Sequence, residues 1–166
     1  MATSKRDRDP QGRPRNARPR DSAGRPLPRG AEGLEQPPED DAAPEPREAL
    51  REAQQLLDTG YPFHAHEVLE AAWKASSAPE RDMWQGLAQL AVGLTHAQRG
   101  NATGAAALLR RGAERIGTRA TDPPHGLDLA GLVQHAVTLA ERIERDGLDG
   151  LSADDLIVRL RGALAE

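Results

Sequence analysis

The chain has 166 residues, a formal net charge of −4 and no cysteine. This length suits one ordinary domain, and the absence of cysteine excludes disulfides and thiolate zinc sites. Only 2% of the residues are aromatic, so the core must consist of Ala, Leu and Val, which favours closely packed helices over a thick sheet sandwich. No stretch has the ~20 apolar residues of a membrane span, and the N-terminus lacks the apolar segment of a signal peptide. We therefore expect a cytoplasmic protein that does not contact a membrane.

The first 46 residues have a composition of their own. They contain no Val, Ile or aromatic residue, so they cannot bury enough apolar area to offset their chain entropy, and we predict that 1–46 is a disordered tail. Nine of the thirteen prolines fall there: Pro10, Pro14, Pro19, Pro26, Pro28, Pro37, Pro38, Pro44 and Pro46.

The charge of the tail is divided, with a basic part over 1–30 and an acidic part over 31–46. An arginine-rich arm can associate with nucleic acid or with an acidic partner. No aromatic side chain is present for base stacking, and the acidic part can neutralise the arm, so a solvated tail is favoured over nucleic-acid binding. The arginines concerned are Arg13, Arg15, Arg18, Arg20, Arg25 and Arg29.

Beyond the tail, apolar residues recur at helical spacing and no segment alternates with period two. We predict helices over 46–58, 62–76, 80–99, 102–118, 128–146 and 153–165. The predicted fold is all-α, a compact bundle of five to six helices built from antiparallel α-hairpins. Residues 47–120 are expected to form a four-helix core and 121–166 a helical extension that packs on the same core.

The helix predicted over 80–99 should be central, because the run Met83–Gln98 carries no charge and its apolar side chains cover most of the circumference. Gly86 and Gly93 would let a neighbouring backbone approach closely. Similar residues also recur forty positions apart, which indicates two similar α-hairpins packed together. The matching pairs are Gly60 and Gly100, Ala65 and Ala105, Leu69 and Leu109, and Ala72 and Gly112.

Two polar stripes are the candidates for a functional site. His66, Glu70 and Trp73 share one face of the second predicted helix, with Glu67 about 60° away. Gln85, Gln89 and His96 lie within about 40° of one another on the third. If the two helices pack antiparallel through these stripes, the side chains form one polar cluster roofed by Trp73.

Three interpretations of this cluster stay open. It is a hydrogen-bonded polar seam, a pocket for a small molecule or peptide, or a site in which His66, Glu70 and His96 hold a divalent transition metal. The seam is favoured, because the motif reads His-Glu-x-x-Glu and lacks the second imidazole of His-Glu-x-x-His. The metal alternative corresponds to a metal-dependent hydrolase or other metalloenzyme that uses His66, Glu67, Glu70 and His96.

No nucleophile signature or phosphate-binding loop occurs in the sequence. We therefore favour a non-enzymatic binding or interaction module over an enzyme. We expect no cofactor, and we expect the ligand to be a protein or a small molecule. We expect His64 to be exposed at a helix start. His125 and His135 are expected at the surface.

Three sequence blocks resemble a family of helical prokaryotic proteins, the domain-of-unknown-function family 309. The first block, Phe-x-Ala-His-Glu-x-x-Glu-x-x-Trp, falls on residues 63–73. The second, Gln-Gly-x-x-Gln followed by His and Gly-Asn, falls on 85–101, and the third, Gly-Ala-x-x-Leu-Leu, on 104–109. The resemblance covers about 48–145 and implies a small all-α bundle without an assigned activity. It also implies that one constellation contains His66, Glu67, Glu70, Trp73, Gln85, Gln89 and His96.

Overall fold

The computed structural model describes residues 20–27 and 45–161. These residues contain five α-helices and no strand, which confirms the all-α prediction. Most of the predicted disordered tail, 1–19 and 28–44, lies outside the described residues. The helices are α1 (Pro46–Asp58), α2 (Pro62–Ala75), α3 (Arg81–Gln98), α4 (Ala102–Gly117) and α5 (Leu129–Asp146), with short 3-10 helices η1 (Pro124–Gly126) and η2 (Asp154–Leu156).

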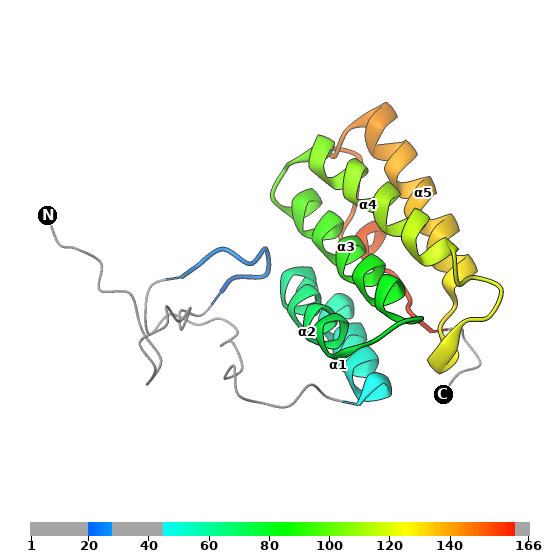
Figure 1. The fold of residues 1–166 in the computed structure, drawn as a ribbon. Coiled ribbons are helices and arrows are strands. Elements are labelled where there is room, and N and C mark those ends of the chain that lie inside the picture. Colours follow the sequence, from blue (N-terminus) through cyan, green and yellow to red (C-terminus); the bar gives the residue numbers. More distant parts are fainter. Residues whose placement is uncertain (1–19, 28–44, 162–166) are drawn as a thin grey trace, which may run out of the picture.

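Each helix packs against the next one in the chain, and α3 lies in the middle of the array (Figure 1). Trp84 and Leu94 of α3 are almost completely buried, as expected for a helix that is apolar nearly all round. A single cluster of buried apolar residues extends from Ala49 of α1 to Leu160 near the end of the described chain. Among the described helices, none is long and apolar enough to cross a membrane.

Glycines set the distance between α3 and α4. A Cβ atom built on Gly112 would lie 2.9 Å from the backbone oxygen of Gly86, and one on Gly86 would lie 2.6 Å from Cγ2 of Ile116. A Cβ on Gly93 would lie 3.1 Å from Leu109. The predicted close approach at Gly86 and Gly93 is therefore present, and the two helices meet almost backbone to backbone.

We expect Gly112→Ala to destabilise the protein by about 1–3 kcal/mol, because the added methyl group meets a backbone oxygen that cannot rotate away. Gly117→Ala in the same helix is the control, since its Cβ would meet only Val133 at an ordinary 3.8 Å. Gly117→Ala should leave stability unchanged or raise it by up to about 1 kcal/mol. Urea unfolding measures both values, and similar values would contradict the close packing.

The turns after α1 and α3 are alike, as the forty-residue repeat indicates. Gly60 and Gly100 have φ of 83° and 80°, the left-handed region in which glycine is favoured. The amide of the following residue donates to a carbonyl five residues back in both turns, from Tyr61 to Leu56 and from Asn101 to His96. This is the Schellman pattern of helix termination.

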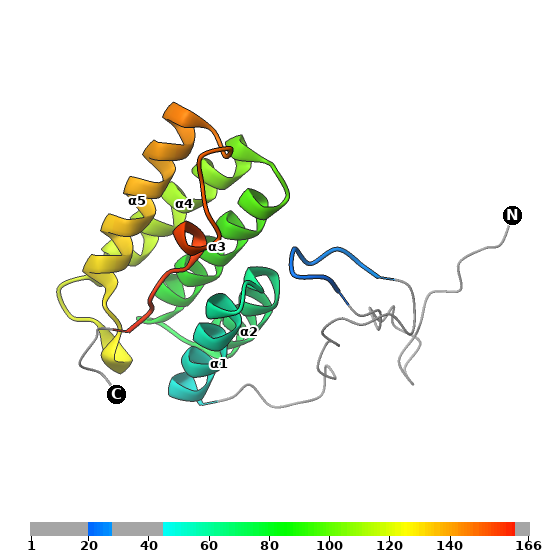
Figure 2. The same ribbon diagram turned by 180° about the vertical axis from the view of Figure 1, so that it is seen from behind.

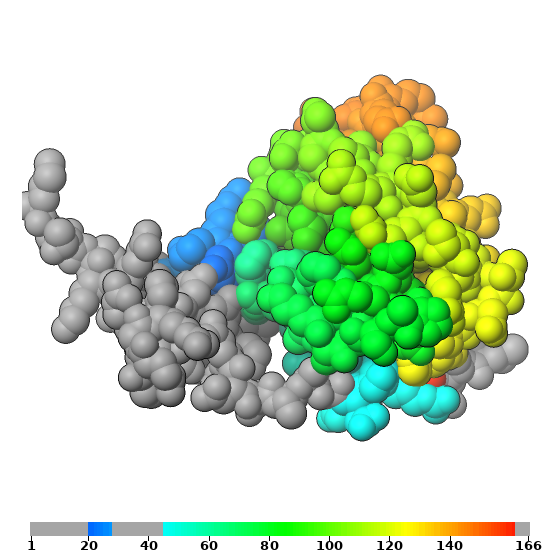
Figure 3. Space-filling model, viewed as in Figure 1, coloured from blue at the N-terminus to red at the C-terminus, as the bar shows by residue number. Residues whose placement is uncertain are grey.

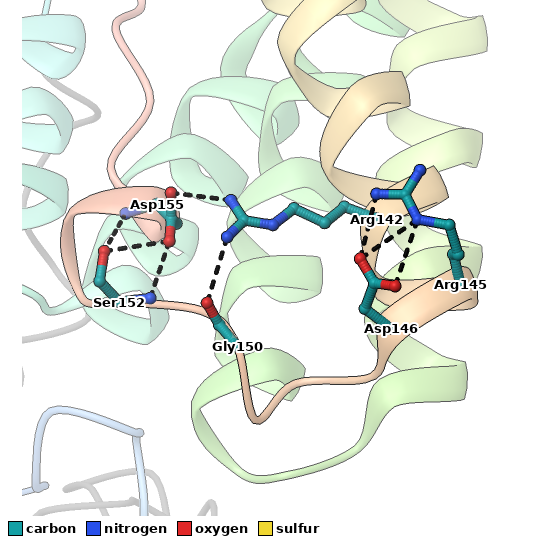
Figure 4. Close-up of polar contacts among 6 residues, drawn as sticks. All are labelled: Arg142, Arg145, Asp146, Gly150, Ser152 and Asp155. Atoms are coloured by element: carbon teal, nitrogen blue, oxygen red, sulfur yellow. Dashed lines mark hydrogen bonds and ion pairs between the residues drawn. The ribbon is translucent and has the colours of Figure 1, made fainter.

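The helix predicted over 153–165 is wrong within the described residues. Ser152 and Asp155 form the reciprocal capping contacts expected of a helix start, with Ser152 N donating to Asp155 Oδ2 at 2.7 Å and Asp155 N to Ser152 Oγ at 3.3 Å (Figure 4). Arg142 of α5 also donates to Asp155. Yet the caps open only the short η2, and the chain then becomes extended; residues 162–166 lie outside the described residues.

Residues 157–161, which we call the strap, run back over the bundle between α5 and α1 (Figure 2). Val158 and Leu160 are buried while Arg159 between them is exposed, an alternation that suits extended chain and not a helix. Burial of these alternate side chains takes precedence over local helix propensity.

One side chain of α1 holds the strap as a neighbouring strand would. The amide of Gln54 donates from Nε2 to Val158 O at 2.9 Å and accepts at Oε1 from Leu160 N at 2.8 Å. The carbonyl of Leu160 also accepts a hydrogen bond, from Asp128 N at 2.9 Å. The strap thereby connects α1 to the start of α5.

We expect Gln54→Ala to destabilise the protein by about 1–3 kcal/mol, because it leaves a carbonyl and an amide of the strap without partners. The amide of Leu160 should also exchange with solvent faster. Gln55→Ala is the matched control, since the Gln55 side chain is exposed on the same helix. Unchanged exchange at Leu160 would show that Gln54 does not hold the strap.

Candidate functional site

The polar residues of α2 include a pair one helical turn apart. His66 Nε2 lies 3.2 Å from Glu70 Oε2, and Lys74 Nζ lies 3.0 Å from Glu70 Oε1. Glu67 and Trp73 are partly buried on the same helix. Trp73 is less buried than the other tryptophan, Trp84, whose exposed fraction is only 1%.

The stripe of α3 lies on the side of that helix that is only partly covered, with Gln85, Gln89 and His96 all half-buried. His96 Nδ1 lies 3.1 Å from Asn101 Nδ2, at the cap of α4. Among the described residues, His66 and His96 share neither a hydrogen bond nor a ring contact.

Two cation–π contacts fix how α2 lies against α3. The Arg99 guanidinium at the end of α3 is 5.7 Å from the Phe63 ring centroid at the start of α2. At the opposite end, the Arg81 guanidinium is 5.3 Å from the Trp73 ring. The two helices are therefore antiparallel, as predicted, and His66 lies between these two contacts.

Several polar atoms of the stripes have no hydrogen-bond partner among the described residues. These buried atoms are Nδ1 of His66, Nε1 of Trp73 and Oε1 of Gln89. Buried polar groups in proteins are almost always paired. The side chains of the described residues thus do not complete the hydrogen-bonded seam that the sequence favours.

Burial lowers the pKa of the His66 imidazole below its ordinary value. The nearby Glu70 carboxylate acts in the opposite direction and Lys74 in the same direction, but desolvation of the charged ring is the largest contribution. The imidazole is therefore neutral in the folded protein at neutral pH.

The lowered pKa of His66 makes stability depend on pH. Because the unfolded chain binds this proton more readily than the folded one, the free energy of unfolding should rise between about pH 5 and about pH 7. His66→Gln should make this rise smaller, while His135→Gln, at an exposed position of α5, should not. Urea unfolding at both pH values measures the difference, and an equal rise in all three proteins would contradict the lowered pKa.

The metal alternative requires several ligands in one place. Among residues 20–27 and 45–161, no group of three or more His, Asp or Glu side chains is placed to hold a metal ion. The candidates His66 and Glu70 are paired with each other, whereas His96 contacts Asn101.

A cleft lies at the other end of α2, away from His66. It has a volume of about 460 Å³ and opens between the start of α1, the segment linking α2 to α3, and η1. Two carboxylates and one imidazole line it, together with small apolar and hydroxyl side chains. The lining residues are Glu45, Pro46, Ala72, Ala75, Ser76, Ser77, Ala78, Pro79, Glu80, Trp84 and His125.

Glu80 is the best-connected side chain of this cleft. Its Oε2 accepts from Trp84 Nε1 at 3.2 Å and contacts His125 Nε2 at 2.9 Å. Burial acts to raise the pKa of Glu80, but the hydrogen bonds from His125 and Trp84, together with the electrostatic attraction of His125 and Arg119, outweigh it and lower this pKa. An ionised carboxylate can only accept, so Nε2 of His125 must carry a hydrogen.

Sequence reasoning missed this site because His125 lies 45 residues from its partner Glu80. The prediction that His125 is a simple surface residue is wrong: its side chain is 22% exposed and paired. Its φ of 59° is the left-handed region, which non-glycine residues rarely adopt and which often marks a functional site. The sequence Pro-Pro-His-Gly was the available signal.

His64 was also predicted wrongly. It is buried, with 6% of its surface exposed, and its ring packs edge-on against Tyr61 and Phe63. A helix start is usually exposed, but here the aromatic rings of Tyr61 and Phe63 pack against the imidazole. His135, by contrast, is exposed as predicted.

The comparison with known families confirms the resemblance inferred from the motifs. Residues 50–108 match the family described as Domain of unknown function (DUF309). The matched segment contains Phe63, the two polar stripes and Glu80, whereas His125 lies beyond it. No curated protein and no solved structure matched the chain.

Proposed function

We propose that this protein is a non-enzymatic binding module whose cleft, lined by Glu80 and His125, takes a small ligand with an aliphatic ammonium or guanidinium group. The observation that carries the proposal is the ionised Glu80 carboxylate held in place inside a cleft of ligand size. A volume of about 460 Å³ falls within the range typical of small-molecule sites.

The charge of the cleft favours a cation. Glu45 and Glu80 line it, and no Lys or Arg is among its described lining residues. Ala72, Ala75 and Ser76 belong to the C-terminal end of α2, where the helix dipole places partial negative charge. A positively charged group would thus be attracted by Glu45, by the Glu80 oxygen that Trp84 and His125 leave unpaired, and by the end of a helix.

The hydrogen bonds of Glu80 leave one oxygen for a ligand. Both donors from the protein, Trp84 and His125, contact Oε2, while Oε1 accepts from none of the described residues. A carboxylate whose orientation is already fixed loses little entropy when it binds. The small side chains of Ala75, Ala78 and Pro79 offer an apolar wall to the aliphatic part of the ligand.

We expect butylamine and butylguanidine to bind in this cleft and butyrate not to bind. Binding should shift the indole N–H resonance of Trp84 in NMR titrations of the full chain, while that of Trp73, which does not line the cleft, stays in place. Glu80→Gln should weaken binding by about tenfold or more, because a hydrogen bond to a charged group contributes about 1.5–3 kcal/mol.

Asp82→Asn is the matched control, because Asp82 lies on the same helix, outside the cleft, and pairs with Arg115. It should bind the amines as the wild type does. The ligand recovered after long incubation should be chemically unchanged, as a binding role requires. Equal binding of butyrate, or unchanged affinity in Glu80→Gln, would contradict a cation site.

A further inference from the structure

Phe63 begins the sequence motif of α2, and two arginines lie over its ring. The guanidinium carbon of Arg20 is 4.8 Å from the ring centroid and that of Arg99 is 5.7 Å away. Arg99 comes from the end of α3, but Arg20 comes from the N-terminal segment predicted to be a solvated tail. Neither arginine forms an ion pair with a carboxylate of the described residues.

Residues 20–27, which we call the docked turn, fold back on themselves beside Phe63. Gly24 N donates to Asp21 O at 3.0 Å, and Arg25 N donates to the Asp21 side chain at 2.8 Å. Arg20 reaches across the turn to donate to Gly24 O at 2.5 Å. These contacts are local, so the segment forms a compact turn and not an arbitrary path of the chain.

The docked turn also contacts the helical domain directly. Arg99 Nε donates to Ala23 O at 2.8 Å, and Ala23 is buried with 8% of its surface exposed. In the space-filling view, the docked turn (blue) lies against the helices (Figure 3). One main-chain carbonyl and one aromatic ring therefore hold the turn to the ends of α2 and α3.

Gly24 fits this place for two independent reasons. Its φ of 76° lies in the left-handed region, where side chains are disfavoured. A Cβ atom at Gly24 would in addition overlap the Phe63 ring. The contact thus selects an arginine and a glycine four residues apart in the same turn.

We propose that Phe63 and Arg99 form a recognition surface for an Arg-x-x-x-Gly turn, and that residues 20–27 of the same chain occupy it. This surface is distinct from the Glu80 cleft, because Phe63 and Ala75 lie at opposite ends of α2, on the order of 20 Å apart. Its occupant is covalently attached, so a contact of this small area is favoured by a high effective concentration. A free peptide of the same sequence must compete with it.

The docking in the full chain is tested by NMR. The α-protons of Gly24 lie against the Phe63 ring, so their resonances should be shifted upfield by the ring current in the wild type. Phe63→Leu and Gly24→Ala should each abolish the docking, seen as random-coil shifts for Ser22 and Ala23. Ser22→Ala should leave the docking unchanged, because the Ser22 side chain is exposed. Random-coil shifts at Gly24 in the wild type would overturn the proposal.

The recognition surface is tested with a free peptide of residues 20–27. The Gly24→Ala chain has its surface vacated, so it should bind this peptide at least about tenfold more tightly than the wild type, in which the attached turn competes. The Gly24→Ala peptide should not bind, whereas the Ser22→Ala peptide should. Adding Arg99→Gln to the Gly24→Ala chain should abolish binding. Absence of peptide binding to the Gly24→Ala chain, or equal binding to both chains, would overturn the proposal.

Discussion

The close contact between α3 and α4 determines how the rest of the bundle is built. A chain with almost no aromatic residues cannot fill wide gaps between helices, so its helices must approach one another closely. Gly86 and Gly112 make this approach possible by removing the side chains between the two backbones. Besides α4, helix α2 packs against α3. Buried Leu and Ala side chains fill the core around α3.

Much of this fold follows from the sequence alone. The helical periodicity gives all five helices to within one residue at either end, and the forty-residue recurrence of Gly60 and Gly100 corresponds to two identical helix-ending turns. These features are local, so spacing along the chain is enough to find them. Residues 153–161 were mispredicted because the caps at Ser152 and Asp155 are local helix signals, whereas the burial of Val158 and Leu160 depends on α1 and α5.

The contacts of the candidate sites also fall into local ones, which sequence spacing predicts, and long-range ones, which it does not. The pairing of His66 with Glu70 is a contact one helical turn apart, and sequence spacing predicts it. The Glu80–His125 pair joins distant parts of the chain, and the docking of Gly24 on Phe63 depends on a loop path that no periodicity reveals. The polar motif of α2 thus lies between two surfaces, a cleft with carboxylates at one end of the helix and an aromatic ring with arginines at the other.

The strap explains why no sixth α-helix follows α5 within the described residues. A sixth helix of five residues would span only about 7.5 Å, and its own outer face would need a further layer to cover it. The same five residues in extended form reach about 16 Å, which lets Val158 and Leu160 both contact Gln54 while Leu160 also contacts Asp128 at the start of α5. Extended chain also presents only two buried side chains, Val158 and Leu160, so it needs no further layer. The strap therefore ends the array of α-hairpins, whereas another helix would have extended the array by one more layer.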